Sequence, residues 1–164
     1  MAVFTVDAYI KAGSNAGAFP GAIVLVIDET KGADAIVAYK QGVPEISRLS
    51  NPAARIVLTP DSPSETLARV MINKFSLPSL PTDWLQAADG AEAVYKKLKS
   101  TNPTDPKAFV LWEPYVSKAL ALDGVHILLD SSKLKGYIVD VLVAERRFLS
   151  EDPDQVQAVA EAYL

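Results

Sequence analysis

The chain has 164 residues, of which 49% are hydrophobic and 22% are charged, an ordinary globular composition that allows one domain or two small lobes. It contains no cysteine and a single histidine, His126, which excludes thiol catalysis, disulfide bonds, thiolate metal sites and multi-histidine metal sites. The net charge of −4, with scattered basic residues, argues against a nucleic-acid partner.

No apolar run of the sequence approaches the roughly 18 residues that a membrane span requires. The longest apolar run is Ala22–Ile27, which has the length of a buried strand. The first ten residues lack the basic region and the cleavage site of a secretion signal. The residues themselves therefore leave two compartments open: the cytoplasm, or the cell envelope with the signal absent from this sequence.

The first third of the chain alternates apolar and small-residue segments. Val3–Ile10 fits a short strand or the edge of a helix, and Ala12–Gly21, rich in Gly, Ala, Ser and Asn, predicts a loop. Ala22–Ile27 is rich in β-branched residues and predicts a strand covered on both faces. Ala35–Tyr39 predicts a second strand, and Pro44–Leu49 predicts one helical turn.

The rest of the chain alternates strands and helices. Further strands are predicted at Arg55–Leu58, Ala108–Trp112, Val125–Leu129 and Ile138–Ala144, and Trp84–Ala88 fits a strand or an irregular segment. Helices are predicted at Ser62–Phe75, Gly90–Leu98, Glu113–Leu120 and Pro153–Leu164. This alternation predicts an α/β fold with mainly parallel sheets and flanking helices.

The segment from Thr59 to Thr66 carries the clearest local signal. Ser62 stands at the N-cap position with Pro63 at the first helical position, and Ser62 and Glu65 have the spacing of a capping box. Free N–H groups at a helix start attract anions and carbonyl oxygens, so Ser62 and Ser64 are candidate ligand-binding residues. The alternative interpretation is a well-capped helix without a ligand.

Three further segments carry polar groups next to strands. Trp112 and Glu113 stand where a strand gives way to a helix, although Trp112 also fits a core anchor and Glu113 a helix cap. The acidic stretch from Asp28 to Asp34 fits either a cation or amine site or a solvated turn. Asp140 lies inside an apolar strand, where a carboxylate needs a partner or a cleft.

The order of four segments resembles the substrate-binding proteins of nitrate-, sulfonate- and taurine-type ABC transporters. These segments are Thr30–Val37, Asp61–Ser64, Leu111–Pro114 and Asp140–Val143, followed by Phe148-Leu149 and Asp152-Pro153. The resemblance implies part of a two-lobed type 2 periplasmic-binding-protein fold, with 1–45 and 110–164 in a partial first lobe and 46–109 in the second. It also implies a periplasmic or envelope location and contact with ABC transporter membrane subunits.

Carried over by this resemblance, the ligand would be a small polar or anionic solute held between the lobes. The ligand-binding residues would be Asp28, Ser62, Ser64, Trp112, Glu113 and Asp140, with no cofactor, metal or catalytic residue. The sequence lacks the strand and helix with which family members begin, so the first lobe is predicted to be truncated at its N-terminus. A homo-oligomer would then cover the open strand edges.

Two other functions compete with solute binding. An enzyme would need a base beside Ser62 or Ser64, and His126 is the only histidine in the sequence. Relatives of the fold that act in thiamin-precursor synthesis use cysteines and a histidine that this chain does not match. The other alternative is a structural or assembly domain of a larger envelope protein that binds no ligand.

Overall fold

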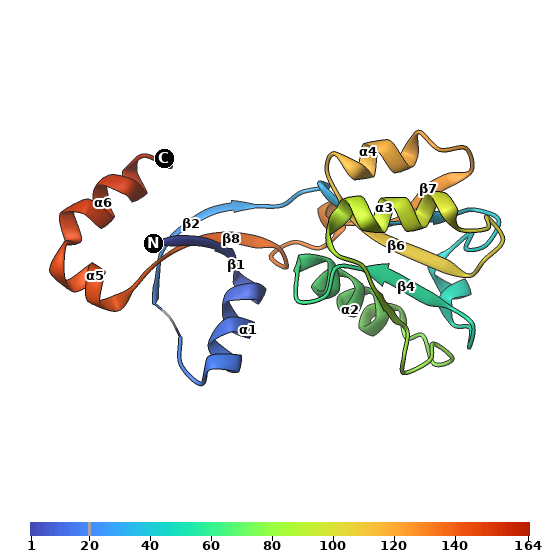
Figure 1. Cartoon of the computed structure of the whole chain (residues 1–164), viewed down its shortest axis with the longest axis horizontal. Coiled ribbons are helices and arrows are strands. Elements are labelled where there is room, and N and C mark those ends of the chain that lie inside the picture. The colour runs from blue at the N-terminus through green and yellow to red at the C-terminus, as the bar shows by residue number, and fades with distance from the viewer. Residues whose placement is uncertain (20) are drawn as a thin grey trace. The chain divides into compact units, whose positions relative to one another are not determined.

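The computed structural model describes residues 1–19 and 21–164 and divides the chain into two compact units (Figure 1). Unit 1 comprises Met1–Thr30 and Lys135–Leu164, and unit 2 comprises Lys31–Leu134. The chain therefore leaves unit 1, completes unit 2 and returns to unit 1. Each unit has its own sheet and its own apolar core.

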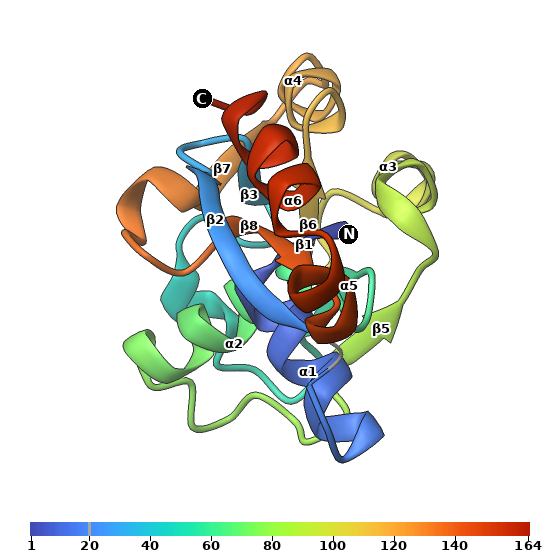
Figure 2. The ribbon, with the colours of Figure 1, turned by 90° about the vertical axis from the view of Figure 1, so that its left-hand side faces the viewer.

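Unit 1 is built on a three-stranded antiparallel sheet in the order β1-β8-β2. Its elements are β1 (Ala2–Thr5), α1 (Val6–Ala16), β2 (Ala22–Glu29), β8 (Val139–Ala144), α5 (Arg146–Glu151) and α6 (Pro153–Glu161). The central strand β8 comes from the C-terminal part of the chain and both outer strands from the N-terminal part. Figure 2 shows β2 as a long, curved strand.

Helix α1 covers residues 12–16, half of the loop that was predicted for residues 12–21; Pro20 of that range lies outside the described residues. The small residues serve packing, because a Cβ on Gly13 would overlap the ring of Phe19. That ring also packs against Tyr9, with the ring centroids 5.3 Å apart. The helix ends at Gly17, whose φ of 68° is the left-handed conformation that favours glycine.

Strand β2 was predicted to be covered on both faces, and this prediction is wrong. Ile23 and Val26 are 46% and 62% exposed. The reason is that β2 is an outer strand of a small sheet rather than a central strand under two helix layers. The continuous apolar run therefore indicates a high β-propensity here, but it does not indicate complete burial of the strand.

Unit 2 contains a five-stranded sheet in the order β5-β4-β6-β3-β7. Its strands are β3 (Asp34–Tyr39), β4 (Arg55–Leu58), β5 (Leu85–Ala87), β6 (Lys107–Trp112) and β7 (Val125–Asp130). Its helices are α2 (Pro63–Phe75), α3 (Gly90–Ser100), α4 (Tyr115–Leu120) and the short 3-10 turns η1 (Ile46–Leu49) and η2 (Ser131–Lys133). The predicted α/β class is confirmed.

The sheets are mixed rather than mainly parallel, which corrects that part of the prediction. Strands β5, β4 and β6 run parallel, whereas β3 is antiparallel to both of its neighbours, β6 and β7. Strand β3 enters the sheet directly from unit 1 without a preceding crossover helix. The strand–helix alternation of the sequence does not reveal this reversal, because a strand's direction depends on where the chain enters the sheet.

Helices cover both faces of the unit 2 sheet. On one face, Leu67 and Met71 of α2 pack against Ile36 and Ile56. On the other face, α3 and α4 pack against Val37 and Phe109 among other core residues, and Figure 1 shows α2 and the α3–α4 pair on opposite sides of the strands. Side chains that alternate along each strand thus pack into two separate cores, one on each face of the sheet.

The compact units do not follow the lobe boundaries predicted from the resemblance. Residues 31–45 and 110–134 were predicted to belong to the first lobe, but they lie in unit 2. The physical reason is the position of β3, which is hydrogen-bonded between β6 and β7 and so joins all three strands to one sheet.

Leu67 is fully buried on the inner face of α2, so replacing it should destabilise unit 2 strongly. Leu67→Ala is expected to lower the free energy of unfolding by about 2–5 kcal/mol, because it leaves a cavity in the core. Chemical denaturation of the purified chain measures this change. Leu120→Ala is the matched control, since Leu120 is 41% exposed and its loss should cost less than about 1 kcal/mol. Equal effects of the two substitutions would contradict the described core.

Candidate functional site

The carboxyl ends of several unit 2 strands meet at one edge of the sheet, here called the carboxyl edge. Strands β4, β5 and β6 are parallel and end there, and β7 ends there too, because both β6 and β7 are antiparallel to β3. Strand β3 begins at the same edge. Ligands of open α/β sheets bind outside such carboxyl ends, so this edge is the candidate functional site.

Ser62 positions the start of helix α2 at the carboxyl edge. Its Oγ donates a hydrogen bond to the carbonyl of Thr59 (2.6 Å) and accepts one from the amide of Ser64 (3.3 Å). The predicted N-cap is therefore confirmed. The helix is 13 residues long, and its N-terminal end carries a partial positive charge.

Two side-chain hydroxyls beside this helix start have no hydrogen-bond partner within the described residues. They are Thr59 Oγ1 and Ser64 Oγ, and both oxygens are buried. Ser64 as a whole is fully buried. A buried hydroxyl without a partner costs roughly 1–3 kcal/mol, so such groups in a folded protein need an explanation, and a bound ligand or water supplies one.

Glu65 completes the helix start in a way that differs from the predicted capping box. Its carboxylate accepts a hydrogen bond from the amide of Asp61 (2.8 Å) rather than from Ser62, and it also accepts one from Arg69 Nε (2.8 Å). Asp61 has a φ of 56°, so the chain turns sharply just before the N-cap. This turn brings one more backbone donor to the Glu65 carboxylate.

Trp112 and Glu113 lie at the carboxyl end of β6, at the same sheet edge as the start of α2. Trp112 is half-buried and packs against the core beneath α3 and α4. The Glu113 carboxylate is exposed and accepts hydrogen bonds from the amide (3.2 Å) and the hydroxyl (2.8 Å) of Ser117. Trp112 therefore acts as a core anchor and Glu113 as a cap of the following helix. Part of the Trp112 side chain nevertheless remains exposed at the carboxyl edge.

Asp34, the last residue of the acidic stretch predicted as a cation or amine site or a solvated turn, and Ser131, which was not predicted as a site residue, both belong to the carboxyl edge. Asp34 is buried at the start of β3, directly opposite Trp112. Ser131 follows β7, and its Oγ accepts hydrogen bonds from the amides of Gly32 (2.7 Å) and Asp34 (3.4 Å). The only signal for Ser131 in the sequence was a pair of serines after a predicted strand. Ser131 lies beside Asp34 because β3 runs antiparallel to β7, which the sequence did not reveal.

Asp28 and Asp140 lie in unit 1, apart in the chain but directly opposite each other in the β2–β8 pair. A β-bulge between Val26 and Asp28 sets this register. Partial burial raises the pKa of the Asp140 carboxyl above its ordinary value of 3.8, and the nearby negative charges of Asp28 and Asp7 raise it further. Like charges placed opposite each other in a sheet are destabilising.

His126 cannot serve as a base for the serines at the start of α2. It stands near the start of β7, four residues before Asp130 at the carboxyl edge, which is about 13 Å along a strand. Its Nε2 is also held by the carbonyl of Val43 at 2.8 Å. Among residues 1–19 and 21–164, no cluster of three or more His, Asp or Glu side chains is arranged to hold a metal ion. No helix in these ranges has the length and apolarity to cross a bilayer.

No protein-family model matches the sequence, and no curated protein matches it. Solved structures do match. The periplasmic aliphatic sulphonate-binding protein SsuA of Escherichia coli superposes with a TM-score of 0.67 at 18% identity, covering 98% of this chain and 50% of that protein. The alkanesulfonate-binding protein SsuA of Xanthomonas axonopodis pv. citri, bound to MOPS, has a TM-score of 0.63 at 19% identity, covering 98% and 53%.

A third similar structure is the ligand-binding component of an ABC-type import system from Staphylococcus aureus, with zinc bound. It has a TM-score of 0.68 at 14% identity and covers 98% of this chain and 53% of that protein. This chain therefore spans about half the length of these neighbours. The likeness confirms the predicted fold, that of part of a type 2 periplasmic binding protein.

Removing the Ser62 hydroxyl should destabilise helix α2. Ser62→Ala is expected to lower the free energy of unfolding by about 1 kcal/mol, because Ser64 loses its acceptor and Thr59 its donor. Thermal or chemical denaturation measures this loss. Asp89→Ala is the matched control, since the N-cap side chain of α3 makes no capping hydrogen bond, and it should cost clearly less. A larger loss for Asp89→Ala would contradict the described caps.

The raised pKa of Asp140 makes the stability of unit 1 depend on pH. Because the folded protein holds this proton more tightly than the unfolded chain, the contribution of Asp140 to stability is fully present below about pH 3.8 and is lost as the pH rises through the folded pKa. Asp140→Asn should therefore raise the Tm at pH 7, and the gain should vanish in acid. Melting curves between pH 3.5 and 8 measure this. Asp123→Asn, at an exposed turn, is the charge-matched control; an equal gain from it would contradict the assignment.

Proposed function

We propose that the chain is a solute-binding component of an ABC transporter, or part of one, and that it captures a small polar or anionic ligand at the carboxyl edge of unit 2. The observation that carries this proposal is the start of α2, where a positively polarised helix end lies beside two buried hydroxyls that have no hydrogen-bond partner among residues 1–19 and 21–164. The fold of sulfonate-binding and other ABC import proteins supports it.

The polar groups of the edge define the ligand class. The first turn of α2 offers backbone N–H groups, and Ser64 offers a hydroxyl that can donate to an oxyanion. The exposed part of Trp112 offers an apolar surface to the rest of the ligand. A small oxyanion with or without a short organic group, such as a sulfonate, a phosphate or nitrate, matches these groups.

Asp28 and Asp140 of unit 1 remain, by themselves, a proposed site for a positively charged group. The pair concentrates negative charge in unit 1. An amine bound at this pair would neutralise that charge. The Glu113 carboxylate, which accepts a hydrogen bond from Ser117, is also negatively charged and also favours a positively charged group.

In this proposal the protein acts in the periplasm or on the outer side of the cell envelope and passes its ligand to membrane subunits of a transporter. The structural neighbours support this location and partner, since they include a periplasmic binding protein and a component of an import system. No catalytic step is proposed, since His126 is distant from the serines at the start of α2.

Binding of a small oxyanion can be separated from folding by Ser64→Ala. Because Ser64 Oγ has no hydrogen-bond partner in the part of the chain that the structure describes, this substitution should leave the Tm unchanged or slightly raised. The wild-type chain should show a saturable rise in Tm with ethanesulfonate, phosphate or nitrate. Ser64→Ala should weaken the effective anion by about tenfold or more, the range of a hydrogen bond to a charged group.

Ser100→Ala, at the exposed C-terminal end of α3, is the matched control and should bind the anion as the wild type does. Equal affinities of the wild type and Ser64→Ala would contradict the role of Ser64. Absence of a Tm rise with all three anions, in a chain that is monomeric, would contradict anion capture by this chain.

One observation favours the second candidate function, a structural or assembly domain. The outer strands of the unit 1 sheet expose Val3, Ile23 and Val26, and among the described residues their outer edges have no strand partner. A domain that assembles with further polypeptide would cover these side chains. Light scattering on the anion-free chain separates the two functions: a stable oligomer with no anion response favours assembly.

A further inference from the structure

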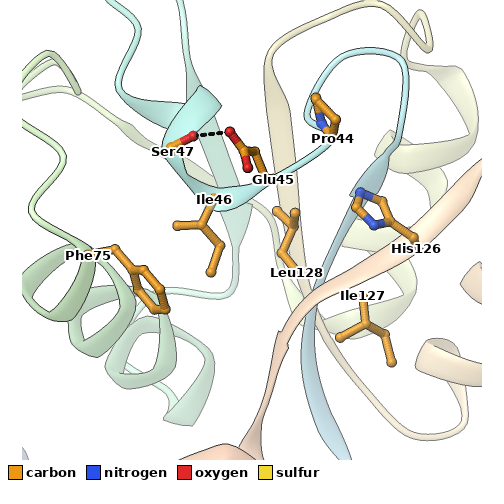
Figure 3. A pocket seen from close by; sticks show the side chains of 8 residues that line it. All are labelled: Pro44, Glu45, Ile46, Ser47, Phe75, His126, Ile127 and Leu128. Atoms are coloured by element: carbon orange, nitrogen blue, oxygen red, sulfur yellow. Dashed lines mark hydrogen bonds between the residues drawn. The ribbon is translucent and has the colours of Figure 1, made fainter.

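A pocket lies at the amino edge of the unit 2 sheet, the edge opposite the carboxyl edge described above (Figure 3). It is formed where β7 begins, where the loop after β3 leads into η1, and where α2 ends at Phe75. Its volume of about 400 Å³ lies within the range of small-molecule sites. All of its lining residues belong to unit 2.

A β-bulge in β7 lies beside the pocket, whose apolar wall includes Leu128. In the pairing of β3 with β7, Ile36 lies opposite Leu129 and Val37 lies opposite Ile127, so Leu128 has no residue opposite it. The bulge places Leu128 and Leu129 on the same face, where both belong to the core beneath α2, whereas Ile127 lies opposite Val37 of the other core. Figure 3 shows Leu128 and Ile127 on opposite sides of the strand, with Leu128 on the side of Ile46 and Phe75. Ile127 is 39% exposed, and Phe75 across the pocket is 44% exposed.

The polar groups of the pocket are hydrogen-bond acceptors. Glu45 accepts a hydrogen bond from Ser47 Oγ at Oε1 (2.6 Å), which leaves Oε2 and the negative charge for another donor. His126 Nε2 must be the donor to the carbonyl of Val43, so Nδ1 of the neutral ring is an acceptor. The lining contains no lysine or arginine.

Helix α2 adds to this negative character. Phe75 is the last residue of the helix, so the C-terminal carbonyls, which carry a partial negative charge, lie on the pocket side. The same helix starts at the carboxyl edge, where its N–H groups favour anions. The two ends of α2 therefore favour ligands of opposite charge at opposite edges of the sheet.

We infer that this pocket is a second binding site, distinct from the carboxyl edge, for small amphipathic organic cations. The apolar group of such a ligand packs against Ile46, Phe75 and Leu128, and its ammonium group donates to Glu45. An apolar pocket with a few convergent polar groups is the usual form of a small-molecule site. A carboxylate of the same shape is excluded by charge, because Glu45 would repel it.

The test is a titration of the ¹⁵N-labelled full chain with 2-phenylethylammonium, followed by amide chemical shifts. The amides of residues 44–47, 75 and 126–128 are expected to shift and saturate. The isosteric anion 3-phenylpropionate should not shift them at the same concentrations. Glu45→Gln keeps the bond to Ser47 and should weaken the cation about fivefold, the range of an exposed ion pair.

Two further variants complete the test. Asp123→Asn removes the same charge from an exposed turn outside the pocket lining and should bind the cation as the wild type does. Phe75→Ser should weaken the cation by removing the apolar wall while the exposed position keeps the fold intact. Equal binding of cation and anion, equal effects of Glu45→Gln and Asp123→Asn, or coverage of the pocket by a second copy of the chain in solution would overturn the inference.

Discussion

Unit 2 depends on the hydrogen-bonded alignment of β4 with β6. These strands are parallel, with Ile56 opposite Ala108 and Val57 opposite Phe109, so both end at the same edge of the sheet. Ser62 and Trp112, 50 positions apart in the sequence, come to that edge because of this pairing. If either strand shifted by one residue, its side chains would exchange the two faces and both cores would lose their apolar contacts.

Helix α2 connects this edge to the opposite one. Its 13 residues span about 20 Å, so a helix that starts at the carboxyl edge ends near the start of β7. The helix dipole then gives the two edges opposite electrostatic character. The buried hydroxyls of Thr59 and Ser64 accompany the positive end, and Glu45 accompanies the negative end. The charge preferences proposed for the two sites therefore have one structural cause.

Local irregularities in the strands matter as much as the strands themselves. The bulge before Asp28 places that carboxylate opposite Asp140, where a regular continuation from the Val26–Val141 pair would place Ile27. The bulge at Leu128 places Leu128 and Leu129 on the same face of the sheet, and Leu128 also lines the pocket at the amino edge. Bulges of this kind redirect side chains at the edges of sheets.

The sequence alone determined the α/β class, most strand and helix positions and the cap of α2, because these follow from local propensity, apolar periodicity and the spacing of Ser62 and Pro63. The order of its segments also indicated the fold. The sequence did not reveal helix α1, because its small residues are typical of a loop. They lie in a helix here because Phe19, six positions after Gly13 in the sequence, packs on them.

Only the tertiary structure decided the antiparallel direction of β3, the membership of β3, β6 and β7 in one unit, and the exposure of β2. The same holds for the meeting of Asp34 with Trp112 and for the pocket around His126. The physical reason is that these features depend on strand partners and bulges. A partner is selected by packing between distant segments, and the residues of one segment do not encode the register of the other.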